Sequence, residues 1–217
     1  MPRLIIALAV LVAGQTARAQ RSPLSISILG HLGPVSIDSL AIRVDVGASR
    51  GATFHAVTAV FADLKIPIDT RDSVRGIVGV ANLAKMRTYA NARISRYLDC
   101  GSGMTGANAD DWRVYITTFA FVDAVDSSTT ALRLAMVGGA REVAGNSTAP
   151  VACGSTGALE SLIATRVKAR LATGSNSLPH GDPAGGADRQ PHSSASAGAA
   201  DRRGGLSVRP EALHRRR

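Results

Sequence analysis

Aromatic residues are scarce in this chain, which has four Phe, three Tyr and one Trp among 217 residues. Because hydrophobic residues still make up 45% of the sequence, we expect a core built from Val, Ile, Leu and Ala. The length suits one domain of ordinary size or two small ones. The net charge of +9 comes without a basic stripe or interleaved aromatics, so we expect no nucleic-acid partner.

Long apolar runs are missing except at the N-terminus. Arg3 precedes an apolar run from Leu4 to Ala13, and Ala17-Arg18-Ala19 is a small-x-small cleavage site, so residues 1–19 are predicted to be a signal peptide. The run of about ten residues is short of the roughly 20 that span a bilayer; an uncleaved anchor is the alternative. No cysteine follows the cleavage site to carry a lipid. We therefore expect an extracytoplasmic protein, periplasmic or secreted, with no transmembrane segment after cleavage.

Cysteine is also rare, with Cys100 and Cys153 alone. They lack the C-x-x-C spacing or histidine partner of a zinc site, and no cofactor motif is present, so we predict neither metal nor cofactor. In an oxidising compartment two cysteines usually pair. We therefore predict a Cys100–Cys153 disulfide, whose loop of about 54 residues would contribute on the order of 4 kcal/mol.

The body of the chain, residues 39–172, is predicted to be one α+β domain. Residues 20–38 precede it as a flexible lead-in or an edge strand. From residue 173 to 217 the composition turns to Gly, Ser, Ala, Pro, His and Arg without apolar periodicity, which is typical of a disordered tail and also of arbitrary GC-rich coding.

Hydrophobic periodicity indicates strands in the middle of the domain and helices near its two ends. Thr53 is the expected N-cap of the first helix, and Ser155 or Thr156 that of the last. Residues 81–92 suit a helix or a strand, and 138–152 read as a loop. The predicted strands are 39–46, 66–69, 74–80, 93–98, 112–125 and 129–137, and the predicted helices are 54–64 and 157–171. This order favours a mostly antiparallel sheet with the helices on one face, and a disulfide from a mid-sheet strand to the start of the last helix.

Two segments carry a resemblance. Arg96-Tyr97-Leu98-Asp99-Cys100-Gly101-Ser102-Gly103-Met104-Thr105-Gly106 and the later Cys153-Gly154-Ser155-Thr156-Gly157 resemble a group of small exported bacterial proteins that share R-Y-L-D-C-G-x-G-x-T-G and C-G-S-T-G before a closing helix. That group implies no activity and no functional residues. The element order and the turn from Phe61 to Pro67 resemble, more distantly, the helix-grip domain of BamC-type outer-membrane assembly lipoproteins, which implies a helix-grip-like sheet.

The glycine-rich ends of the cysteine loop form one candidate site. Their backbone amides are able to cradle an anion, and a disulfide would bring the two ends together. The alternative is that the glycines only permit tight turns around the disulfide. The candidate anion-binding residues are Gly101, Ser102, Gly103, Gly154, Ser155 and Thr156.

Other polar residues point less clearly to chemistry. His31 and His55 are the histidines of the domain and its lead-in, but no serine stands at a spacing that indicates a catalytic triad. Asp99, Asp110 and Asp111 are candidate calcium ligands, although turn residues bonded to their own backbone explain them more simply.

Three functions remain open. We expect a non-enzymatic exported domain that binds an envelope protein or helps to organise the cell envelope, because the second face of strand 112–125 is also apolar. The alternative is a carrier of a small lipophilic ligand held between the sheet and the last helix. A hydrolytic enzyme is the third reading. The sequence leaves the oligomeric state open.

Overall fold

The computed structural model describes residues 22–143 and 149–175. The signal peptide expected at 1–19 lies outside the described residues. So does the tail expected from residue 173, apart from its first three residues, which continue the last helix.

The main element is a seven-stranded antiparallel sheet in the order β4-β5-β11-β12-β13-β8, with β3 also paired to β12. Its strands are β3 (Ile42–Val46), β4 (Thr70–Asp72), β5 (Ile77–Lys85), β8 (Leu98–Asp99), β11 (Arg113–Ala124), β12 (Thr130–Arg141) and β13 (Val151–Ser155). The helices are α1 (Ile37–Leu40), α2 (Arg50–Asp63), α3 (Asn108–Asp111) and α4 (Ala158–Ser175), with a 3-10 turn η1 (Ile94–Arg96). Three small hairpins complete the fold: β1 (Ser25–Ser27) with β2 (Pro34–Ser36), β6 (Thr88–Tyr89) with β7 (Ala92–Arg93), and β9 (Ser102–Gly103) with β10 (Gly106–Ala107). The predicted α+β class is confirmed; the helix-grip resemblance stays a prediction.

The β11–β12 hairpin is the centre of the sheet, as the alternation of residues 112–125 and 129–137 predicted. The two strands pair without interruption from Arg113–Arg141 to Ala124–Thr130. The Asp126 carboxylate accepts hydrogen bonds from the backbone N–H groups of Ser128 and Thr129, which closes the turn between them.

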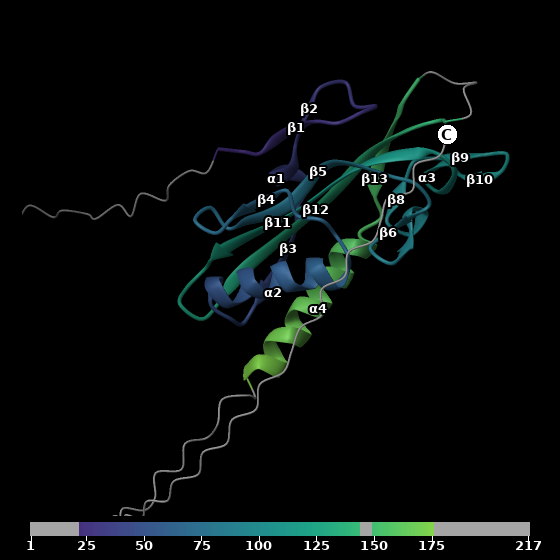
Figure 1. Cartoon of the computed structure of the whole chain (residues 1–217). Helices are drawn as coiled ribbons and strands as arrows, with labels where there is room; N and C mark the ends of the chain where they lie inside the picture. The colour runs from purple at the N-terminus through teal and green to yellow at the C-terminus, as the bar shows by residue number, and fades with distance from the viewer. Residues whose placement is uncertain (1–21, 144–148, 176–217) are drawn as a thin grey trace, which may run out of the picture. The chain divides into compact units, whose positions relative to one another are not determined.

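Helices α2 and α4 cover one face of this sheet (Figure 1). The apolar stripe predicted for α4 is confirmed, because Leu159, Ile163 and Val167 are buried in the core. Helix α2 begins four residues earlier than expected. Its N-cap is Ser49, whose hydroxyl accepts from the Ala52 N–H at 3.4 Å, so Thr53 lies inside the helix and is fully buried.

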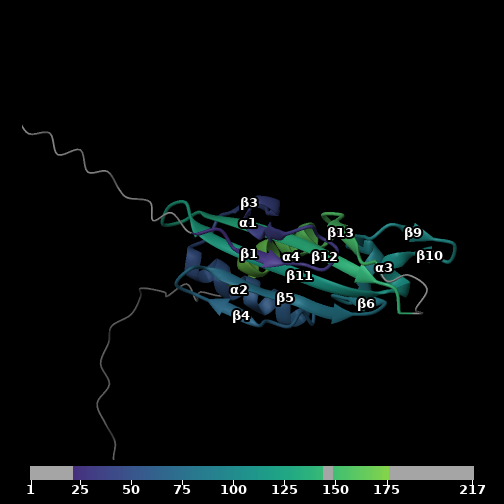
Figure 2. The same cartoon turned by 90° about the horizontal axis from the view of Figure 1, so that it is seen from above.

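The opposite face is covered by residues 22–41, which we call the N-terminal strap. Figure 2 shows β1 lying over the centre of the sheet, and Figure 1 shows it on the side away from α4. Ile28 and Ile37 of the strap pack against Phe119 and Phe121 of β11, and all four are at most 4% exposed. Of the two alternatives for this segment, a strand and a flexible lead-in, the described residues 22–38 agree better with the strand, although β1 pairs with β2 and not with the main sheet. The second face of β11 is not an open surface.

Several strand boundaries also differ from the sequence-based prediction. The hairpin expected to turn at residues 70–73 turns at 73–76, because Gly76 takes a positive φ of 67°, so 70–72 form β4. Residues 81–85 continue β5 and do not form a helix. The strand expected at 93–98 is mostly η1, which buries Ile94 and Tyr97 three residues apart.

Candidate functional site

One side of β12 is shared by two strands that do not meet. Residues 130–134 pair with β3, and residues 138–140 pair with β13. Among the described strands, none pairs with Ala135, Met136 or Val137 on this side. The pairing on this side is therefore interrupted in the middle of β12, one of the two longest strands of the sheet.

A groove of about 550 Å³ lies at this interruption. Met136 and Val137 line it from β12, while Leu40 and Ile42 form an apolar wall and are still 45% and 48% exposed. The remaining lining residues are His31, Val35, Ala152, Cys153, Gly154, Ser155, Gly157 and Glu160. The volume is within the range of small-molecule sites, which are typically apolar with a few placed polar groups.

Glu160 supplies the acidic group of the groove lining. It is the third residue of α4, where the positive end of the helix dipole favours a carboxylate. The side chain is only 4% exposed, and its Oε1 accepts a hydrogen bond from the Ser155 hydroxyl at 2.6 Å. Its Oε2 is buried and has no hydrogen-bond partner in the described structure. A buried carboxylate oxygen without a hydrogen-bond donor is unusual and destabilising, so its presence at this position needs a structural or functional reason.

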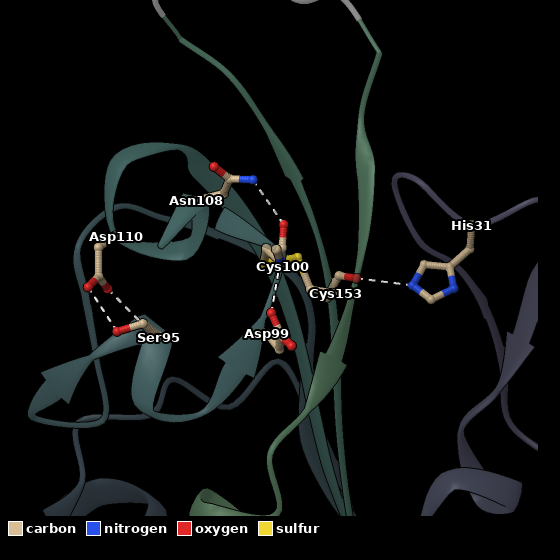
Figure 3. The surroundings of a disulfide bond; sticks show 9 residues. His31, Ser95, Asp99, Cys100, Asn108, Asp110 and Cys153 are labelled. Atoms are coloured by element: carbon tan, nitrogen blue, oxygen red, sulfur yellow. Dashed lines mark hydrogen bonds between the residues drawn. A yellow bond between two sulfur atoms is a disulfide. The ribbon is translucent and has the colours of Figure 1, made fainter. Parts of the chain in front are cut away.

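The predicted disulfide between Cys100 and Cys153 is present beside the groove, with the two Cα atoms 4.3 Å apart. Strands β8 and β13 place it, since Asp99 pairs with Gly154 in their register. It therefore joins the edge strand β8 to β13, and does not join a mid-sheet strand to the helix cap as expected. Figure 3 shows Asp99 and Asn108 on one side of the disulfide and His31 on the other.

The disulfide joins the two glycine-rich segments at Cys100 and Cys153, but backbone amides on both sides of it already have partners. The Gly101 N–H donates to the Asp99 carboxylate at 2.8 Å, and the Thr156 N–H donates to the Tyr97 carbonyl at 3.0 Å. The hydroxyl of Thr156 donates to the carbonyl of Arg96.

The other candidate anion-binding residues are also engaged elsewhere. Ser102 and Gly103 leave the corner to form the β9–β10 hairpin, and the Ser155 hydroxyl is bonded to Glu160. Two carboxylates, those of Asp99 and Glu160, accept hydrogen bonds where an anion would have to sit. The geometry therefore gives the anion-binding hypothesis no support.

The remaining polar candidates stabilise turns. Asp110 accepts from the backbone N–H and the hydroxyl of Ser95 at 3.0 and 2.8 Å, and Asp111 accepts from the Thr105 hydroxyl. Within residues 22–143 and 149–175, no group of three or more His, Cys, Asp or Glu is placed to hold a metal ion.

The histidines do not form a nucleophile–base pair in the described part of the chain. The Nε2 of His31 lies 3.0 Å from the Gly138 carbonyl, and His55 makes an edge contact with the Phe54 ring. The hydrolase reading thus gains no support from the geometry.

In comparisons with known proteins, no family model matches the chain and no curated protein matches it in sequence. Across the described residues, no helix is both long and apolar enough to cross a membrane. What the fold and the site define is a class: a disulfide-linked α+β domain with an apolar groove at an interrupted sheet edge and a buried carboxylate in its wall.

Proposed function

We propose that the chain is an exported, non-enzymatic binding domain whose groove holds a small, mainly apolar molecule. The groove at the interrupted edge of β12 carries this proposal. Leu40 and Ile42 remain 45% and 48% exposed there, next to the buried Met136 and Val137. Apolar surface that remains exposed in a concave site is typical of ligand binding. The disulfide supports export, because disulfides persist in oxidising compartments.

This site differs from the two that the sequence suggested. An envelope partner was expected to bind the second apolar face of β11, but the strap buries Phe119 and Phe121. A ligand was expected between the sheet and α4, but Leu159, Ile163 and Val167 pack against the sheet in that space. The edge groove leaves room that neither of these two places does.

Binding of the neutral dye Nile red to the full mature chain tests the proposal. We expect saturable fluorescence enhancement at one site, competed by decanol. The double variant Leu40→Gln/Ile42→Gln should weaken binding by roughly tenfold, since two half-buried contacts of about 0.7 kcal/mol each are lost.

The matched control is Val74→Gln/Val125→Gln, which alters two exposed apolar residues outside the groove. It should bind the dye as the unmodified chain does. Equal weakening in both double variants, or no saturable binding at all, would contradict the proposed site.

Export has its own test. Cells are fractionated with an alkylating agent present. The mass of the unreduced protein from the cytoplasmic and the extracytoplasmic fractions is then measured by mass spectrometry. We expect it outside the cytoplasm with both cysteines protected from alkylation. Recovery from the cytoplasm with two alkylated thiols would reject export.

A further inference from the structure

We propose that the groove's ligand carries a protonated amine, which Glu160 binds through its unpartnered Oε2. This inference rests on the proposed function and narrows it to a ligand class: an amphipathic molecule with an apolar body and an ammonium head. The apolar body lies along Leu40 and Ile42, and the head lies at the start of α4.

The hydrogen bonding of Glu160 carries the inference. Ser155 occupies Oε1 and fixes the carboxylate, whereas Oε2 is buried and lacks a donor. An ammonium supplies both things that this oxygen lacks, a hydrogen-bond donor and a positive charge. Glu160 lines the groove, and the terminal torsion of a glutamate is soft, so a bound ammonium reaches Oε2 after a rotation of the carboxylate.

The charges around the groove support the same choice. Among the described residues that line the groove there is no Lys or Arg, and Glu160 is the acid. A ligand with a carboxylate or phosphate head would meet repulsion from Glu160, and an alcohol would supply a donor without compensating the charge.

Three probes with the same decyl chain separate the head group from the apolar body. Decylamine, decanol and decanoate are titrated below their critical micelle concentrations against Nile red on the full mature chain at pH 7. We expect decylamine to bind at least tenfold more tightly than decanol, and decanoate to bind most weakly. Glu160→Gln should abolish the amine preference, so that the ratio of the decanol and decylamine dissociation constants falls to about one. The matched control is Glu142→Gln, which removes the same charge outside the groove and should keep the preference.

A second measurement needs no substitution. A water-soluble carbodiimide that enters the groove activates the carboxylate of Glu160, and the bound amine, after losing a proton to water, attacks the acyl carbon, forms an amide and releases the urea by-product. Peptide mass spectrometry should find decylamine on Glu160, and the amount of this adduct should fall when decanol competes for the groove.

The outcomes distinguish this inference from the proposed function. Equal binding of the three probes, or an amine preference that survives in Glu160→Gln, would overturn the role of Glu160 while the apolar groove stands. Absence of binding by every probe and by Nile red would overturn the proposed function itself.

Discussion

Gly139 is the position at which a single methyl group should lift the N-terminal strap from the sheet. A Cβ placed on Gly139 would lie 1.7 Å from the carbonyl oxygen of Leu29 and 2.6 Å from its carbonyl carbon. These are backbone atoms of the strap, so no side-chain rotation relieves the clash. The strap makes a second close approach one residue later, where Gly30, at a φ of 81°, lies against the backbone of Val151. Gly139→Ala therefore requires the strap to move.

The expected loss of stability follows from what the strap buries. Ile28 and Ile37 are 4% and 0% exposed, and burying such a side chain stabilises a fold by about 1.5–3 kcal/mol. If both leave the sheet, Gly139→Ala should lower the free energy of unfolding by about 3–6 kcal/mol. Phe119 and Phe121, which form the other side of this contact, should then become accessible.

Urea unfolding and binding of the dye anilinonaphthalene sulfonate measure these two effects. We expect a lower unfolding midpoint and new dye fluorescence in the native baseline for Gly139→Ala. The control is Gly138→Ala, whose Cβ would meet the flexible Leu98 side chain at 2.9 Å and the Tyr115 carbonyl at 3.0 Å, away from the strap. It should bind no extra dye. The reasoning is refuted if Gly139→Ala unfolds within about 0.5 kcal/mol of the unmodified chain and binds no dye, since this is the usual range of a neutral surface change.

Three further predictions are checked by urea unfolding. Replacing Cys100 and Cys153 by alanine should cost about 4 kcal/mol from loop entropy, and reducing the unmodified protein should cost a similar amount; a change below about 1 kcal/mol would contradict this. Burial raises the pKa of Tyr89, so above pH 10 the phenol ionises in the unfolded chain but not in the folded one. The free energy of unfolding should therefore fall by up to about 1.4 kcal/mol per pH unit, and Tyr89→Phe should remove that slope. Hydrogen bonds from Ser128 lower the pKa of Asp126 below 3.8, so the contribution of this carboxylate to the free energy of unfolding is present above that pH and is lost as the pH falls further. Asp126→Asn should remove this acid-dependent part of the stability loss.

The local patterns of the sequence were sufficient for the centre of the fold. The β11–β12 hairpin alternates over more than ten residues, and α4 repeats its apolar positions at helical spacing, so each could be recognised without its neighbours. The N-terminal strap could not be recognised in this way. Its strands are three residues long, and its burial depends on Phe119 and Phe121, which lie more than 80 residues away in the chain. A short apolar stretch and a flexible lead-in look alike until the surface that covers them is known.

The groove was beyond sequence reasoning for a related reason. Ile42, Val137 and Glu160 come from three separate segments, and they meet only because β3 and β13 share one side of β12 without meeting. An acid in the first turn of a helix is favourable on local grounds alone, but the burial of Glu160 and its unpartnered oxygen depend on tertiary packing.

The charge preference of the site is reversed by the same packing. In the sequence, the Gly-Ser-Thr ends of the cysteine loop present unpaired amides, which favour an anion. In the fold, Asp99 accepts from the Gly101 amide, the Tyr97 carbonyl accepts from the Thr156 amide, and Glu160 accepts from Ser155. The donors of this corner are therefore used internally, and the group without a partner is an acceptor, Oε2 of Glu160. A site with an unused acceptor and an apolar wall selects a donor with positive charge, and that is why we expect an amine there and not a phosphate or a carboxylate.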